Sequence, residues 1–158
     1  MVTRRSLLLG MTALGALSAC GAGRESTKSP RADLLNLYPG ETPALRAKIN
    51  HWADHYGVPR SLVHRVVQRE SDYNTAARNG PYYGLMQILP QTARGMGFEG
   101  EAMALLDADT NLKYGVKYLR GAWMCADGDE QTAVMWYARG YYYEAKRRGI
   151  LYETGLRT

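Results

Sequence analysis

Cysteine is nearly absent from this chain, which has two in 158 residues, Cys20 and Cys125. Cys20 follows an N-terminal segment with the features of an export signal, and a lipid attached there would leave Cys125 without a partner. A disulfide framework is then excluded, and the fold must hold by packing alone. No histidine or asparagine lies near Cys125 in a catalytic pattern, so we expect a small, buried apolar residue.

Long hydrophobic runs and clustered charge are also missing. Residues 7–17 are apolar, but this run is too short and too rich in glycine to span a bilayer well. The formal charge is +5, from 20 basic and 15 acidic residues, and no basic stripe indicates a nucleic-acid partner. The length allows one domain with a substantial core.

Histidine is scarce, with three residues in the chain. His51 and His55 lie four residues apart on a predicted helix, which would supply half of a metal site. Trp52 follows His51 where a metalloprotease helix has glutamate, so the ligand set is incomplete. The sequence therefore predicts surface histidines, no metal and no cofactor.

The aromatic residues are unevenly distributed among types, with one phenylalanine against 12 tyrosines and three tryptophans. Packing with polar tips at the surface explains this bias. A carbohydrate groove also explains it, because sugar faces stack on rings and sugar hydroxyls bond phenols. Composition by itself favours the first explanation.

The first 19 residues have the form of a secretory signal peptide. Arg4 and Arg5 form a charged start, an apolar run follows, and Leu-Ser-Ala at 17–19 places small residues before Cys20. This resembles a bacterial lipobox, which predicts that Cys20 is lipidated and anchors the chain in a membrane. An ordinary signal cleaved nearby is the alternative. The paired arginines fit either a twin-arginine signal or a plain charged region.

The predicted location is the periplasm, with a lipid anchor at Cys20. The residue after Cys20 is Gly21 rather than aspartate. The aspartate-type retention signal is therefore missing, which favours the outer membrane. Gly, Ser, Thr and charged residues follow, and they predict a flexible tether. The predicted division is a signal over 1–19, a tether over 20–40, a folded domain over 41–150 and a C-terminal tail over 151–158.

Helical spacing dominates the predicted domain. Thr42 caps a helix that ends at Gly57, and Pro59 begins a second helix that runs to Ser71. A loop follows over 73–83, and the short apolar stretch 84–88 is either a small strand or a turn that leads into the next helix. The remaining predicted helices begin at Pro90, at Asp107 or Asp109, and at Glu130, the last running to Arg148. The sequence therefore predicts a mainly α fold.

Glu70 is the candidate functional residue. It lies at the end of an apolar helical stripe that contains Val63, Val66 and Val67. Burial there would raise the pKa of the carboxyl and make Glu70 a proton donor near neutral pH. The alternative is a solvated carboxylate paired with a neighbouring arginine, and the helix pattern by itself favours that alternative.

The second acid that glycosidases normally need has no obvious place in the sequence. Asp72 is nearest to Glu70, but it would point about 200° away on a continued helix. One carboxyl suffices when the substrate supplies the nucleophile. It protonates the glycosidic oxygen and then takes a proton from an internal hydroxyl that closes on the same carbon.

Several motifs together resemble the soluble type of lytic transglycosylase, lysozyme-like enzymes that cut bacterial peptidoglycan. These motifs are Glu-Ser at 70–71, Tyr-Asn at 73–74, Gly-Leu-Met-Gln at 84–87, the stretch 109–119 and, more loosely, Trp-Tyr-Ala-Arg-Gly at 136–140. The resemblance spans residues 45–148. It implies a goose-type lysozyme or lytic transglycosylase fold, with a small loop or β insert beside the cleft and the catalytic domain over 41–150.

The resemblance also implies a role for each matched residue. Glu70 would be the acid and then the base, and Ser71 would position the substrate or the acid by hydrogen bonding. Gln87 would line the cleft, Met86 would pack beneath the sugar, and Tyr137 would place its hydroxyl near Glu70. The implied substrate is the peptidoglycan glycan strand, cut between N-acetylmuramic acid and N-acetylglucosamine without water to leave a 1,6-anhydro ring.

The chain departs from the family pattern in two places. Ala138 follows Tyr137 where the family usually has asparagine, and Arg139 replaces a small residue. Pro-Tyr-Tyr at 81–83 replaces small residues before Gly84. Three alternatives stay open: a non-catalytic glycan-binding lipoprotein, a lysozyme-like hydrolase, and an accessory enzyme of an envelope-spanning secretion machine.

Overall fold

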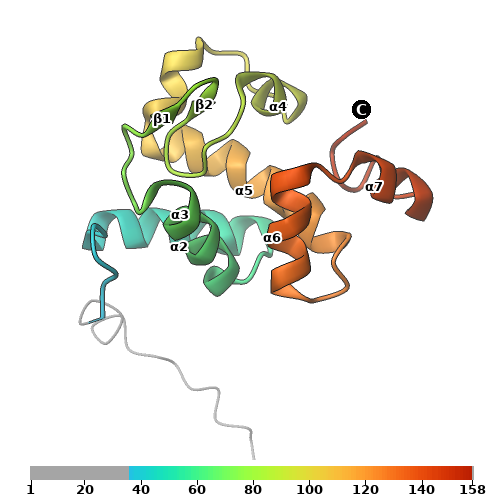
Figure 1. The fold of residues 1–158 in the computed structure, drawn as a ribbon, viewed down its shortest axis with the longest axis horizontal. Coiled ribbons are helices and arrows are strands. Elements are labelled where there is room, and N and C mark those ends of the chain that lie inside the picture. Colours follow the sequence, from blue (N-terminus) through green and yellow to red (C-terminus); the bar gives the residue numbers. More distant parts are fainter. Residues whose placement is uncertain (1–35, 158) are drawn as a thin grey trace, which may run out of the picture.

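The computed structural model describes residues 36–157, which form six α-helices, one 3-10 helix and a two-stranded hairpin (Figure 1). In chain order these are α2 (Pro43–Tyr56), α3 (Arg60–Ser71), β1 (Arg78–Asn79), β2 (Tyr82–Tyr83), α4 (Pro90–Gly95), η1 (Ala102–Leu106), α5 (Ala108–Met124), α6 (Glu130–Arg139) and α7 (Tyr142–Arg148). The predicted signal and most of the predicted tether lie outside the described residues. The mainly α fold is confirmed. Within residues 36–157, no helix is both long and apolar enough to cross a bilayer.

Capping residues delimit the first two helices. Thr42 accepts a hydrogen bond from the Leu45 amide at 3.1 Å, and Gly57 ends α2 with a φ of 64°. Helix α3 ends at Ser71, and the capping residue after it, Asp72, has a φ of 49° and is exposed. Asp72 is therefore a helix-end residue. The predicted ends of both helices are confirmed.

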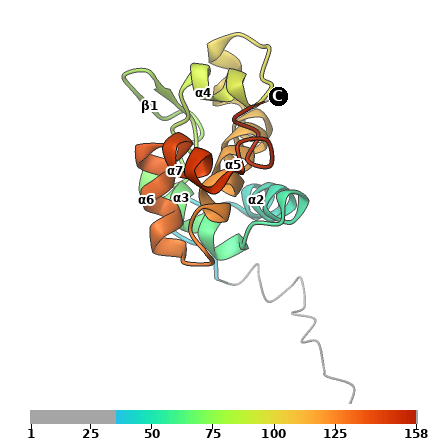
Figure 2. The same ribbon diagram turned by 90° about the vertical axis from the view of Figure 1, so that its right-hand side faces the viewer.

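Helix α5 lies between two groups of elements (Figures 1 and 2). Helices α2 and α3 lie on one side of it, and the hairpin and α4 lie on the other. Asp107 caps α5 by accepting a hydrogen bond from the Thr110 amide at 2.8 Å. The larger core includes Ile49, Leu62, Val66, Leu112, Leu119 and the buried thiol of Cys125. A smaller core under the hairpin consists of Ile88, Ala93, Phe98 and Leu105.

The single helix predicted over 130–148 is wrong. Gly140, with a φ of 80° and a ψ of 144°, separates α6 from α7. Beyond this break Tyr141 is buried, and its hydroxyl donates to the Tyr118 carbonyl at 2.9 Å. Its ring lies against Gly121, where a Cβ would fall 2.3 Å from the phenol oxygen. The apolar stripe continues across the break, so periodicity could not reveal it.

The packed body extends past both predicted domain limits. Tyr38, within the predicted tether, stacks on Tyr73 with ring centroids 5.7 Å apart. At the other end Leu151 and Thr154 are buried, so the predicted C-terminal tail packs on the domain at these two residues. The burial of Leu151 and Thr154 could not be predicted from helical spacing, because both residues lie outside the predicted helices.

A buried polar cluster holds the N-terminal segment, residues 36–41. The Glu41 carboxylate accepts a hydrogen bond from Arg46 Nε at 2.5 Å and lies 3.6 Å from His64 Nδ1. Burial lowers the pKa of His64. Burial alone would raise the pKa of Glu41, but hydrogen bonds from Arg46 and from the Tyr38 amide outweigh it, and the pKa is lowered. The chain is therefore fixed to the body before α2 begins.

Candidate active site

Glu70 lies next to the last residue of α3, with 23% of its side chain exposed. Val66 and Val67 on the same helix are completely buried. Burial raises the pKa of the Glu70 carboxyl, and the Arg69 cation opposes part of this rise. Arg69 Nε lies 3.7 Å from Glu70 Oε1, a loose ionic contact rather than a hydrogen bond. The predicted rise in the pKa is confirmed.

The cleft beside Glu70 consists of two adjoining hollows of about 350 and about 290 Å³. The first is lined by Arg69, Glu70 and Asn79, and the second by Ile88, Leu89, Thr92, Tyr118, Arg139 and Gly140. Both share Tyr82, Gln87, Tyr137 and Ala138. These four shared residues place the two hollows side by side, and we call the two together the groove. Ligand sites commonly have this order of volume, and a groove suits a polymer.

A tight turn, residues 83–88, forms part of the cleft wall, and we call it the cleft turn. Tyr83 and Ile88 pair through two backbone hydrogen bonds of 3.2 and 3.1 Å. Gly84 has a φ of 67°, and a Cβ there would fall 2.4 Å from Asn111 Nδ2, so a larger residue does not fit. Gln87 has a φ of 44°, which is a strained conformation for a residue other than glycine.

Three helices hold the cleft turn through its backbone. From α3, Ser71 Oγ donates to the Leu85 carbonyl at 2.8 Å. From α6, Tyr137 Oη donates to the Met86 carbonyl at 2.8 Å. From α5, Asn111 Oδ1 accepts a hydrogen bond from the Met86 amide at 2.9 Å. The helix that carries the acid is thereby bonded directly to the turn that lines the cleft.

Asn111 is the supporting residue that the sequence analysis missed. Its side chain is completely buried, and its Nδ2 donates to the carbonyls of Tyr83 at 2.8 Å and Leu105 at 2.7 Å. These bonds join the cleft turn, η1 and α5 at one point. A signal was available, because an asparagine next to Leu112 at the start of an apolar helical stripe needs partners when it is buried.

The structure divides the predicted site residues into two groups. Glu70, Gln87 and Tyr137 line the cleft. Gln87 is fixed there, because its Nε2 donates to two backbone carbonyls at 2.8 and 3.1 Å. Ser71 and Met86 are not among the lining residues, and Met86 is completely buried with its sulfur against α5. Their positions are those of residues that support the cleft from behind.

The Tyr137 hydroxyl bonds the Met86 carbonyl rather than the Glu70 carboxyl. Burial, and after it the charge of Glu70, raise the pKa of Tyr137 well above its usual value. The phenol therefore stays protonated and keeps its bond to the cleft turn. Among the described residues, no direct hydrogen bond joins the Tyr137 hydroxyl to the Glu70 carboxyl.

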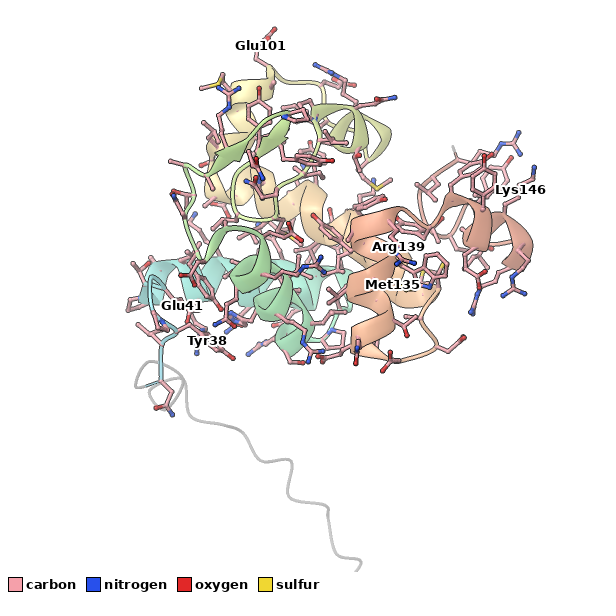
Figure 3. The ribbon with its side chains drawn as sticks, in the orientation of Figure 1. Tyr38, Glu41, Glu101, Met135, Arg139 and Lys146 are labelled. Carbon is pink, nitrogen blue, oxygen red and sulfur yellow. The ribbon has the colours of Figure 1, made fainter. Side chains whose placement is uncertain are left out.

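The departures from the family pattern lie in the cleft wall. Ala138 lines both hollows and Arg139 lines the second, and both side chains are exposed. Figure 3 labels Arg139 on α6. Tyr82, from the Pro-Tyr-Tyr stretch, lines both hollows and is 42% exposed, so its ring is available for stacking on a sugar.

The described residues offer no ligand set for a metal ion. Within residues 36–157, no group of three or more His, Cys, Asp or Glu side chains is placed to hold one. His51 and His55 stack with ring centroids 6.2 Å apart on the exposed face of α2.

A model of one protein family matches the chain. The family is described as the Transglycosylase SLT domain, and the match runs over residues 47–153. It contains Glu70, the cleft turn, Asn111 and Tyr137. No solved structure matches the chain significantly.

Proposed function

The chain belongs to the SLT transglycosylase domain family, whose members are lytic transglycosylases acting on peptidoglycan, and we propose that it cuts the bond between N-acetylmuramic acid and N-acetylglucosamine without water. The family has a lysozyme-like fold, which agrees with the helical body and small hairpin. The proposed product is a 1,6-anhydromuramoyl end, with Glu70 acting first as acid and then as base.

The main support for this proposal is the charge of the cleft lining. Among the described residues that line either hollow, Glu70 is the single acid, and it lines the first. A glycosidase that adds water through two carboxyls places them about 5–9.5 Å apart across the bond. With one carboxyl in the cleft, a nucleophile supplied by the sugar accounts for bond cleavage without a second acid.

The reaction then needs two proton transfers at Glu70. The protonated carboxyl gives its proton to the glycosidic oxygen, and the bond from this oxygen to C1 of the muramoyl residue breaks. The resulting carboxylate takes the proton of the C6 hydroxyl, whose oxygen bonds C1 and closes the anhydro ring. Glu70 is protonated again, and no water is consumed. Holding the hydroxyl beside C1 gives it a high effective concentration.

The surroundings of Glu70 suit both halves of this cycle. Burial favours the neutral carboxyl that begins the reaction, and the Arg69 cation at 3.7 Å stabilises the carboxylate formed midway. Gln87 and Tyr137, both bonded to backbone groups, form a rigid wall next to the acid.

Product mass tests the reaction class directly. Purified sacculi are digested with the mature protein, and the released muropeptides are weighed. We expect muramoyl ends that are lighter than the reducing ends by one water molecule. Reducing ends with the full water content would instead identify a lysozyme-like hydrolase, and binding without release would identify a glycan-binding protein.

We also propose export to the periplasm and attachment to the outer membrane through a lipid at Cys20. The support is the lipobox-like sequence at 17–20, which lies outside the described residues. We expect Cys20→Ser to abolish labelling by a radioactive fatty acid and to move the protein to the soluble fraction. Co-purification of cross-linked envelope proteins would test an association with a secretion machine.

A further inference from the structure

Arg139 is a cation in the cleft wall that no described residue neutralises. Its side chain is exposed and lines the second hollow, and within residues 36–157 it has neither an ion pair nor a hydrogen bond. Several other arginines are paired with carboxylates, among them Arg46, Arg60, Arg147 and Arg148. Arg139 is therefore free to bind a ligand in the groove.

The rest of the groove contains few charges. Among the described lining residues, Arg69 is the other cation and Glu70 the single acid. Because Glu70 begins the reaction protonated, a bound strand meets two cations and no anion. An anionic group on the strand is therefore favoured, and the attraction is strongest where the groove excludes water.

The guanidinium group is well suited to a carboxylate. Its planar fork can donate two parallel hydrogen bonds to the two carboxylate oxygens. Ala138 beside it carries only a methyl group, so the approach from the groove is open. In peptidoglycan the sugar rings are neutral. Carboxylates occur on the lactyl group of the muramoyl residue when it is free, or on the peptide stem attached to it.

We propose that Arg139 binds a carboxylate of the muramoyl side chain and thereby selects the glycan strands that carry one. The inference rests on the proposed function, because it takes the glycan strand as the ligand of this groove. Arg139 determines affinity, and the proton transfers remain with Glu70.

A purely structural role for Arg139 gives a different expectation. It is the last residue of α6, where a cation interacts favourably with the helix dipole. If that were its whole role, replacing Arg139 would lower the melting temperature and leave KM unchanged on every substrate.

The experiment compares wild type, Arg139→Gln and Arg139→Lys on three substrates. These are intact strands with peptide stems, strands stripped by an amidase to expose lactyl carboxylates, and stripped strands whose carboxylates have been converted to amides. The control is Arg94→Gln, which removes an exposed arginine of α4 that is not among the cleft-lining residues. Melting temperatures of all variants report any loss of fold.

For Arg139→Gln we expect KM to rise about tenfold on at least one carboxylate-bearing substrate while kcat changes little. Arg139→Lys keeps the positive charge but not the planar guanidinium fork, so we expect its KM to lie between those of wild type and Arg139→Gln. A rise on intact strands identifies a stem carboxylate, and a rise on stripped strands identifies the lactyl carboxylate. For wild type, KM on the amidated strands should exceed KM on the carboxylate-bearing strands by the same factor. For Arg139→Gln, amidation should raise KM no further.

Two results would overturn the assignment of Arg139. One is a KM of Arg139→Gln that equals the wild-type KM on all three substrates. The other is a rise in the KM of Arg139→Gln over wild type that is as large on the amidated strands as on the carboxylate-bearing strands. The product masses of wild type are independent of this comparison. Anhydro products with an unchanged KM would refute only the role of Arg139, whereas hydrated products with a carboxylate-dependent KM would refute only the water-free reaction.

Discussion

The pKa of Glu70, on which its proposed acid and base roles depend, is set by partial burial and by one neighbouring cation. The side chain keeps 23% of its surface exposed, so a substrate can reach the carboxyl even though burial raises its pKa. Arg69 acts in the opposite direction without forming a hydrogen bond. Both influences can be changed separately by substitution.

Glu70→Gln is expected to lower kcat by about 10²-fold or more, because an amide keeps the shape of the side chain but cannot give and recover a proton. Release of muropeptides from purified sacculi measures the loss. The matched control is Glu101→Gln, which changes an exposed glutamate just before η1 (Figure 3) and should keep full activity. Undiminished activity in Glu70→Gln would mean that another group is the acid.

Arg69→Gln is expected to move the alkaline limit of activity to higher pH. The acid must start protonated, so kcat/KM falls as the pH rises through the pKa of Glu70. Arg69 lowers this pKa, and removing its cation therefore raises it. The pH profile of kcat/KM measures the change, with Arg94→Gln as the matched loss of charge. An alkaline limit that stays in place would have to be set by a group other than Glu70.

At the scale of elements, the position of the cleft turn depends on side chains from three helices. Asn111 contributes most, because it alone contacts three backbone groups. Ser71 and Tyr137 each contact one carbonyl of the turn. The turn should therefore respond most strongly to a change at Asn111.

Asn111→Leu would leave the Met86 amide and the Leu105 carbonyl without partners in a buried position, whereas the Tyr83 carbonyl would keep its bond from the Ile88 amide. Each unpartnered group costs about 1–3 kcal/mol, so we expect the free energy of unfolding to fall by about 2 kcal/mol or more. Denaturant titration followed by circular dichroism measures this. Gln131→Leu, at an exposed position of α6, is the control and should change stability by less than about 0.5 kcal/mol. A loss as small as the control's would show that Asn111 does not hold the turn.

The features that could be predicted from the sequence are those decided by near neighbours. The ends of α2 follow from Thr42 and Gly57, and the raised pKa of Glu70 follows from the apolar stripe on its own helix. Beyond the break at Gly140, Tyr141 packs against a distant glycine, Gly121. The role of Asn111 likewise depends on carbonyls that only the folded chain brings together. Local patterns contain no information on such contacts.

At the scale of the whole molecule, the N-terminal segment connects the domain to the predicted membrane anchor. Figure 3 shows Tyr38 and Glu41 beside the start of α2, far across the view from Arg139. The Glu41 side chain is completely buried between Arg46 and His64. This attachment should weaken in acid, because both titratable partners bind protons more readily in the unfolded chain.

Stability is expected to fall as the pH drops below about 6.5, where an unfolded histidine takes up its proton. The lowered pKa of buried His64 means that the folded state binds fewer protons there. The lowered pKa of Glu41 adds a further loss as the pH approaches and passes below about 4.5. Unfolding free energies from about pH 7.5 to about pH 5 measure the first slope. His64→Gln should flatten it, whereas His55→Gln, at an exposed ring, should not. Equal slopes in His64→Gln and wild type would contradict this account.

The cleft turn is held at main-chain atoms, namely the Tyr83, Leu85 and Met86 carbonyls and the Met86 amide. This has a consequence for how such a protein can evolve. Backbone anchors do not depend on which side chains the outer wall carries, so positions 138 and 139 can be exchanged while the acid keeps its place. If Arg139 selects the strand as we propose, substrate preference can diverge through single substitutions in this wall without a new fold.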